Sequence, residues 1–150
     1  LMLKLPVFGP LLQKVAVAKF TRTLGTLLSS GVSIVEGLSI TAKTAGNKVV
    51  ERSITNSIDS IKEGNAICVP LKQEPIFPSM VIQMIEVGEN VGRLDDMLEK
   101  IADFYDEEVD TAVEGLTALL EPMMMVFLGV SIGFIVVAMY LPIFQMASGL

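Results

Sequence analysis

Apolar residues recur every three or four positions along most of the chain, which is the pattern of amphipathic helices. The first such stripe predicts a helix over 14–30 that ends at Ser30-Gly31; its members are Leu12, Ala16, Phe20, Leu24, Leu27 and Leu28. No segment alternates apolar and polar residues between hairpin turns. The pattern therefore predicts an all-α fold of about six short, antiparallel helices joined by brief loops.

Capping residues divide the next stretch into two further helices. Ser33 is expected to cap a short helix that runs to Ala45-Gly46, and Asn47 to cap a third that Gly64-Asn65 closes. Branched apolar residues at helical spacing define the inner face of the third helix: Val50, Ile54, Ile58 and Ile61.

Prolines mark the middle of the chain. Three of them predict an irregular loop: Pro70, Pro75 and Pro78. The last one suits the start of a fourth helix, with Phe77 as its hydrophobic staple. The predicted apolar face of that helix comprises Met80, Val81, Met84 and Ile85. A turn over 88–92 then leads into a long helix from Arg93, with a kink or break expected near Gly115.

The end of the chain carries no charge. Glu121 is the last charged residue, and the 29 positions from Pro122 to Leu150 contain none. Twenty residues from Pro122 to Leu141 measure roughly 30 Å as a helix, the thickness of a bilayer core. We therefore predict a helical-bundle domain over 1–121, a transmembrane helix over 122–144 that Pro142 helps to end, and a short tail over 145–150. A buried core helix is the alternative, although a chain of 150 residues seldom needs one so long and uncharged.

All eleven Lys and Arg residues precede the predicted span. The positive-inside rule then places residues 1–121 in the cytoplasm and the C-terminus in the periplasm. The nearest basic residue, Lys100, lies about 20 residues from the span, at the edge of the range of that rule. The chain opens with LMLKLPVFGPLL and lacks the parts of a signal peptide, so we expect a fragment cut after an upstream element.

Composition acts mainly by exclusion. An apolar fraction of 51% is too high for disorder, and a net charge of −6 argues against nucleic-acid binding. The absence of His removes His-based triads and His-ligated metals, and no GxxxxGK[ST] phosphate loop occurs. Cys68 is expected to be a reduced, partly buried thiol, although Lys62 and Lys72 could lower its pKa. We predict no catalytic residue, no cofactor and no enzyme activity.

One predicted helix carries a stripe of carboxylates: Asp103, Asp106, Glu107, Asp110 and Glu114. A solvated face is the simplest interpretation. The stripe could also meet a basic patch, because residues 1–85 carry 9 basic and 5 acidic side chains, whereas 86–150 carry 2 and 12. A Ca²⁺ or Mg²⁺ site is the third possibility; no metal ligand is assigned.

Two glycine pairs complete the candidates. Gly88-Glu89-x-x-Gly92 is, by spacing alone, an ordinary turn between helices whose following N-terminus could take an anion. Within the predicted span, Gly129 and Gly133 with nearby Ser131 form a small-residue face that lets two membrane helices approach closely.

Three long segments carry a resemblance to a known family: LPVFGPLLQKVAVAKFTRTLGTLLSSGVSIVEGL, IFPSMVIQMIEVGENVGRLDDMLEKIADFYDEEVD and LLEPMMMVFLGVSIGFIVVAMYLPIF. In this order they resemble the polytopic inner-membrane platform protein of type IV pili and type II secretion systems (the PilC/GspF family). The likeness covers nearly the whole chain and corresponds to the second cytoplasmic helical-bundle domain and the last transmembrane helix of that family.

The resemblance implies a non-catalytic scaffold in the bacterial inner membrane. Its implied partners are a cytoplasmic hexameric ATPase, other inner-membrane assembly proteins, pilin or pseudopilin, and a second copy of itself, with a dimer favoured. The family's most recognisable turn corresponds to Gly88, Glu89, Gly92 and Leu94, which with the acidic stripe are the expected contact surface. A pilus machine is favoured over the F protein of a type II secretion system. A membrane-anchored enzyme or a transporter fragment is a remote alternative.

Overall fold

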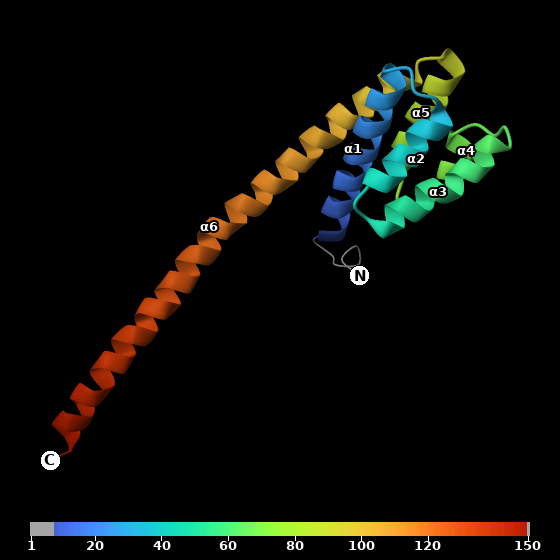
Figure 1. Ribbon diagram of the computed structural model, residues 1–150. Coiled ribbons are helices and arrows are strands. Elements are labelled where there is room, and N and C mark those ends of the chain that lie inside the picture. Colours follow the sequence, from blue (N-terminus) through green and yellow to red (C-terminus); the bar gives the residue numbers. More distant parts are fainter. Residues whose placement is uncertain (1–7, 150) are drawn as a thin grey trace. The chain divides into compact units, whose positions relative to one another are not determined.

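The computed structural model describes residues 8–149, which form six α-helices and no strand (Figure 1). In chain order the helices are α1 (Phe8–Ser29), α2 (Ile34–Thr44), α3 (Lys48–Lys62), α4 (Cys68–Leu71), α5 (Ser79–Val91) and α6 (Leu94–Ser148). The all-α prediction is confirmed, and the long apolar segment is the C-terminal part of α6.

Ser33 and Asn47 cap the N-termini of α2 and α3, as predicted. The N–H of Glu36 donates to Ser33 Oγ at 3.4 Å, and the N–H of Val49 donates to Asn47 Oδ1 at 2.9 Å. Each side chain satisfies one of the N–H groups that the first turn of a helix leaves unpaired. These two helix starts therefore follow from local chemistry alone.

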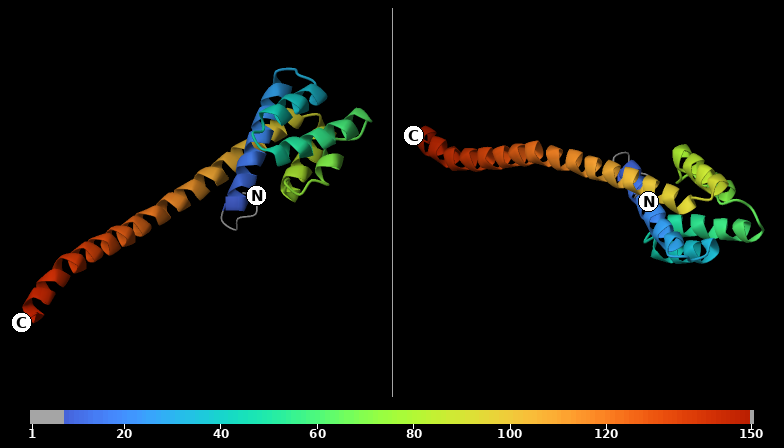
Figure 2. Two further views of the ribbon diagram at one scale, coloured as in Figure 1. Left: turned by 60° about the horizontal axis from the view of Figure 1, so that its bottom comes forward. Right: turned by 90° about the horizontal axis from the view of Figure 1, so that it is seen from above.

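The described chain divides into two compact units, one ending at Asp110 and the other beginning at Thr111. In the first unit each of the helices from α1 to α5 packs on the next, and α1 runs antiparallel to the start of α6 (Figure 2). The rings of Phe20 and Phe77 lie 4.9 Å apart and join α1 to the segment before α5. Large fully buried side chains come from every helix of this unit: Phe20, Leu24, Leu38, Ile54, Leu71, Ile85, Leu98 and Ile101.

Three buried hydroxyl groups, those of Thr21, Thr41 and Ser57, donate within their own helices. Thr21 Oγ1 donates to the carbonyl of Val17 at 2.8 Å, and Thr41 Oγ1 donates to that of Gly37 at 2.7 Å. Among the described residues, no buried side-chain nitrogen or oxygen lacks a hydrogen-bond partner. Hydrogen bonds therefore offset the desolvation cost of burying these polar groups in the core.

The structure corrects the predicted loop and the predicted face of the fourth helix. Pro70 lies within the short helix α4 rather than in an irregular loop, since a proline is tolerated in the first turn of a helix. On α5, Ile82 is buried at 3% exposure whereas Met80 is 37% exposed, so the inner face is rotated from the predicted one. A pattern of nearly continuous apolar residues does not define which side faces the core.

The second unit, described over 111–149, is the continuation of α6. The helix passes through Gly115 without the expected break, and Pro122 and Pro142 both lie inside it rather than at its ends. Its apolar segment is long and apolar enough to cross a membrane, and none of that segment is buried within the protein. The limits 122–144 stay a prediction.

Candidate partner-contact surface

The family-like turn is the last turn of α5 and its C-cap, not a separate loop. The N–H of Arg93 donates to the Gly88 carbonyl at 2.9 Å, and the N–H of Gly92 donates to the Glu89 carbonyl at 3.4 Å. Gly92 has φ = 76°, a left-handed conformation that glycine adopts without steric cost. This is the Schellman motif, which satisfies carbonyls at the helix end and reverses the chain into α6.

Gly88 lies where α5 and α6 pack tightly against each other. A Cβ atom on Gly88 would lie 3.0 Å from Leu94 Cα and 3.0 Å from Met97 Cγ. A side chain at this position would therefore require the backbone of Leu94 or the side chain of Met97 to move by a few tenths of an ångström. Leu94, which is 9% exposed, belongs to the same packed corner.

Glu89 ties α5 to the start of α4. Its carboxylate accepts from the N–H of Ile67 at 2.5 Å and from the N–H of Cys68 at 3.4 Å. These are orphan donors at a helix N-terminus, where a negative charge is also favourable. Half-buried Glu89 thus has a structural role that spacing alone does not reveal.

The environment of Cys68 suppresses its reactivity. Burial raises the pKa of the Cys68 thiol, and the hydrogen bond and charge of Glu89 raise it further, with a smaller contribution from Glu86. Lys72 acts in the opposite direction and is outweighed. The thiol is buried, at 8% exposure, rather than partly buried as predicted, and the net direction is opposite to the lowering that the lysines could have produced. That the thiol is reduced stays a prediction.

A groove of about 480 Å³ opens at the α5–α6 corner. The groove residues come from four helices or their ends: Leu28, Ile34, Gly88, Glu89, Gly92, Leu94 and Asp95. All four residues of the family-like turn are among them. We call this hollow the corner groove.

The acidic stripe meets a basic partner inside the first unit. One guanidinium nitrogen of Arg22 lies 2.6 Å from Asp103 Oδ1 and 2.8 Å from Asp106 Oδ2, and Lys14 Nζ lies 3.0 Å from Glu108 Oε2. Hydrogen bonds to Asp106 and then Asp103 raise the pKa of Arg22. For this part of the stripe, the basic residues that the carboxylates meet lie on α1 of the same chain.

The remaining carboxylates differ in their surroundings. Glu107 also takes part in an interaction. Asp110 is exposed in the first unit, and Glu114 is exposed in the second. Across residues 8–149, no group of three or more His, Cys, Asp or Glu side chains converges as a metal site would.

Sequence reasoning missed Arg22, Lys14 and Glu108 as members of this charged surface. Lys14 and Arg22 lie eight positions apart, about two helical turns along the same broad side of a helix, which is a weak signal for a basic stripe. Only the antiparallel packing of α1 on α6 brings Arg22 to carboxylates 81 and 84 positions away.

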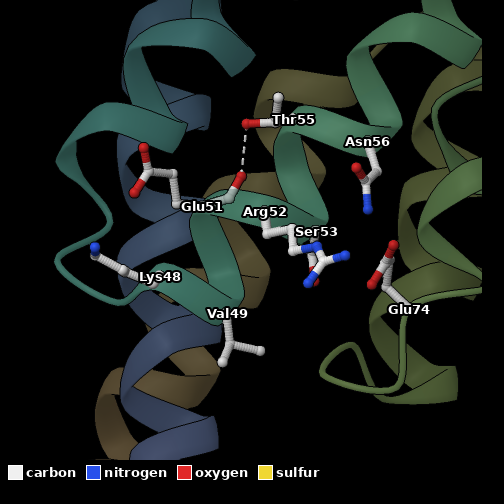
Figure 3. Close-up of a pocket in the computed structure, with 8 residues that line it drawn as sticks. All are labelled: Lys48, Val49, Glu51, Arg52, Ser53, Thr55, Asn56 and Glu74. Carbon is white, nitrogen blue, oxygen red and sulfur yellow. Dashed lines mark hydrogen bonds between the residues drawn. The ribbon is translucent and has the colours of Figure 1, made fainter.

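A second, polar groove of about 810 Å³ runs beside α3 (Figure 3). Arg52 and Asn56 of α3 face Glu74 across it, and the Thr55 hydroxyl donates to the Glu51 carbonyl at 2.7 Å. Among the described residues, Arg52 and Glu74 form no ion pair with each other.

The small-residue face lies in the second unit. Cβ atoms built on Gly129 and Gly133 would meet nothing within 4 Å. The Ser131 hydroxyl donates to the carbonyl of Phe127 in its own helix at 2.8 Å. The face is open, and its role in helix packing stays a prediction.

Comparison with known families decides the identity of the chain. The family described as "Type II secretion system (T2SS), protein F" matches residues 20–142, which include the corner, the acidic stripe and most of the apolar segment. The chain belongs to the type II secretion system protein F family. The resemblance inferred from the three sequence segments is confirmed.

Curated members of the type II secretion system protein F family align over nearly the whole chain. The chain is 58% identical to a type IV pilus assembly protein PilC of Myxococcus xanthus over 97% of the chain's length. It is 53% identical to a type IV pilus assembly protein PilC of Thermus thermophilus over 100% of the chain's length. It is 32% identical to a type II secretion system protein F of Pseudomonas aeruginosa over 97%. The chain spans only 35%, 37% and 36% of these three relatives, respectively. Their names are those of pilus assembly and secretion proteins rather than of enzymes.

Proposed function

We propose that the chain is part of an inner-membrane platform protein of a type IV pilus assembly machine. In this role it couples a cytoplasmic ATPase to the insertion or extraction of pilin, without catalysis or a cofactor of its own. The observation that carries the proposal is the identity of 58% and 53% to two PilC proteins, against 32% to a type II secretion system protein F.

The second candidate is the equivalent F protein of a type II secretion system, whose name describes the matched family itself. The two candidates predict different cytoplasmic ATPases and different subunits, pilin in one case and pseudopilin in the other. Other inner-membrane assembly proteins are expected partners in both.

Two surfaces are proposed as contacts within the machine. One is the α5–α6 corner with Gly88, Glu89, Gly92 and Leu94, and the other is the acidic stripe. Exposed Asp110 and Glu114 are the members of the stripe for which no ion pair is found among the described residues, so they retain charge for a partner. Asp103 and Asp106 share theirs with Arg22.

The proposed topology places residues 1–121 in the cytoplasm and the C-terminus in the periplasm. The location of all eleven basic residues before the apolar segment supports it. A Ser148→Cys variant in intact cells tests it: a membrane-impermeant maleimide is expected to label it from outside, and labelling only after lysis contradicts the orientation.

Binding of the purified full chain in detergent to each assembly ATPase tests the function. We expect it to bind the pilus ATPase, and we expect the double variant Asp110→Lys/Glu114→Lys to bind at least about tenfold more weakly because charge reversal repels a basic partner. Asp59→Lys/Glu63→Lys, which reverses two exposed charges four positions apart at the end of α3, is the matched control. Binding to the secretion ATPase alone assigns the chain to the second candidate, and binding to neither overturns the coupling role.

A further inference from the structure

We infer that the corner groove is the docking site for a protein segment that presents a Lys or Arg side chain beside a Leu-sized apolar one. This inference rests on the proposed function and names the chemistry that the cytoplasmic ATPase must offer at this site. The residues that carry it are Leu28, Ile34, Leu94 and Asp95.

The floor of the corner groove is apolar and open. Leu28 at the end of α1 and Ile34 at the start of α2 both line the groove. Leu28 is half-buried, and Ile34 is 37% exposed. Gly88 and Gly92 contribute no side chain to it. Because these two glycines leave space, the groove of about 480 Å³ has room for one or two apolar side chains of a partner.

The charges that line the corner groove have one sign. Its lining contains the carboxylates of Glu89 and Asp95 and no Lys or Arg. Both oxygens of Glu89 face backbone N–H groups at the start of α4, so this carboxylate is committed to the fold. Half-buried Asp95 has no ion pair within the described chain.

The nearest basic residue in sequence does not neutralise this site. Arg93 contacts Asp96, with Nη1 to Oδ2 at 4.0 Å, on the exposed side of the α6 start. Asp95 therefore supplies an acceptor at the edge of an apolar floor. That combination favours a guanidinium or ammonium group on an aliphatic stem over an acidic or a purely apolar segment.

Two variants of the full chain in detergent test the groove, each with a matched control. Asp95→Lys is compared with Asp96→Lys, which makes the same charge change in the same first turn of α6. Ile34→Glu is compared with Ile40→Glu, which lies on the same helix, is also 37% exposed and does not line the groove. Circular dichroism and thermal unfolding establish that each pair remains equally folded.

We expect Asp95→Lys and Ile34→Glu to weaken binding of the purified pilus ATPase by about tenfold or more, while both controls stay within about twofold of the original chain. If all four variants bind alike, the groove inference fails and the coupling role stands. If the original chain binds no ATPase, both fail. If the groove variants change self-association instead of ATPase binding, the occupant is a second copy and the inference is overturned.

A photo-crosslinking experiment examines the chemistry of the occupant directly. The full chain carries p-benzoylphenylalanine in place of Ile34 and is irradiated with the ATPase bound. The crosslinked peptide is expected to contain Lys or Arg within a helical turn of an apolar residue, and an acidic peptide at this position contradicts the inference.

Discussion

Glu89 illustrates how one side chain stabilises a segment distant in sequence. It lies in the last turn of α5, yet its carboxylate accepts from N–H groups 22 and 21 positions earlier, at the start of α4. A short helix has little stability of its own, since the first turn costs several fixed dihedrals for one hydrogen bond. The carboxylate therefore holds α4 in place and also sets the environment of Cys68.

Replacing Glu89 by Ala is expected to lower the free energy of unfolding by about 1–3 kcal/mol, because two buried donors lose a charged acceptor. Thermal or denaturant unfolding of the chain in detergent, followed by circular dichroism, measures the change. Glu86→Ala on the same helix is the control and is expected to cost less than about 0.5 kcal/mol. Equal losses in the two variants contradict the assigned role.

The pH dependence of Cys68 follows first from the burial of its thiol and then from the same contact with Glu89. Its pKa is raised in the folded chain, so the neutral thiol stabilises the fold below the ordinary thiol pKa, and this contribution is lost as the pH rises through the folded value. The rate of alkylation of Cys68 by iodoacetamide is expected to rise at a higher pH than the rate for an exposed thiol does. Glu89→Gln, which removes the adjacent charge, is expected to lower that pH, whereas Glu51→Gln leaves it unchanged; an unaltered profile for Glu89→Gln speaks against the contact.

At the scale of elements, the junction of α5 and α6 depends on contacts that two helices make with each other. The Schellman motif reverses the chain, and the bare backbone of Gly88 lets the start of α6 lie against α5. The same junction forms one wall of the corner groove. Local stability and the proposed contact surface are therefore linked here.

Gly88→Ala is expected to destabilise the bundle by about 1–3 kcal/mol, because the new methyl group overlaps the backbone of Leu94 and the side chain of Met97. Gly115→Ala is the matched control: a Cβ there meets nothing within 4 Å, and alanine favours a helix over glycine by about 0.5–1 kcal/mol. Unfolding midpoints of the two variants should move in opposite directions. An unchanged unfolding midpoint for Gly88→Ala would contradict the tight packing of α5 on α6 at this position.

The contact of α1 with α6 through Arg22 is a different case, because all three side chains are substantially exposed. Arg22 is 44% exposed at its side chain, and Asp103 and Asp106 are 70% and 54% exposed. Exposed ion pairs contribute about 0–1 kcal/mol and are screened by salt. Arg22→Ala is thus expected to change stability by less than about 1 kcal/mol, with the difference shrinking at high salt. A larger, salt-independent loss in denaturant titrations contradicts this assignment.

At the scale of the whole molecule, the chain combines two environments. The first unit buries a continuous core, whereas the apolar residues of the second unit are exposed to their surroundings. Such a surface is stable in a bilayer or against other helices, and costly in water. Family membership and this segment agree with an inner-membrane protein.

Association through the membrane segment is expected to depend on Gly129 and Gly133. Changing both to Ile fills the small-residue face but creates no clash within the chain, since a Cβ at either position meets nothing within 4 Å. Weaker self-association in detergent, measured by analytical ultracentrifugation, is therefore expected. The variant Val130→Leu/Val137→Leu is the control, and unchanged association of the glycine variant removes this face as an interface.

The local sequence was sufficient for most helices and their caps. The 3.6-residue period, the Ser33 and Asn47 caps and the glycine ends depend on neighbours within one or two turns, so they can be read without the fold. The exceptions are instructive. The short helix α4 and the inner face of α5 were misassigned because a loop rich in prolines and a helix apolar on most sides carry little local preference.

The candidate surface divides in the same way. The helical class, the uncharged C-terminal segment, the acidic stripe and the family follow from the order of the residues alone. Three features follow only from the packing of the helices: Arg22 pairs with Asp103 and Asp106, Glu89 faces the start of α4, and Leu28, Ile34 and Asp95 share one groove. The physical reason is that helical periodicity is a property of adjacent turns, whereas these contacts depend on which helix faces are buried against each other across distant parts of the chain.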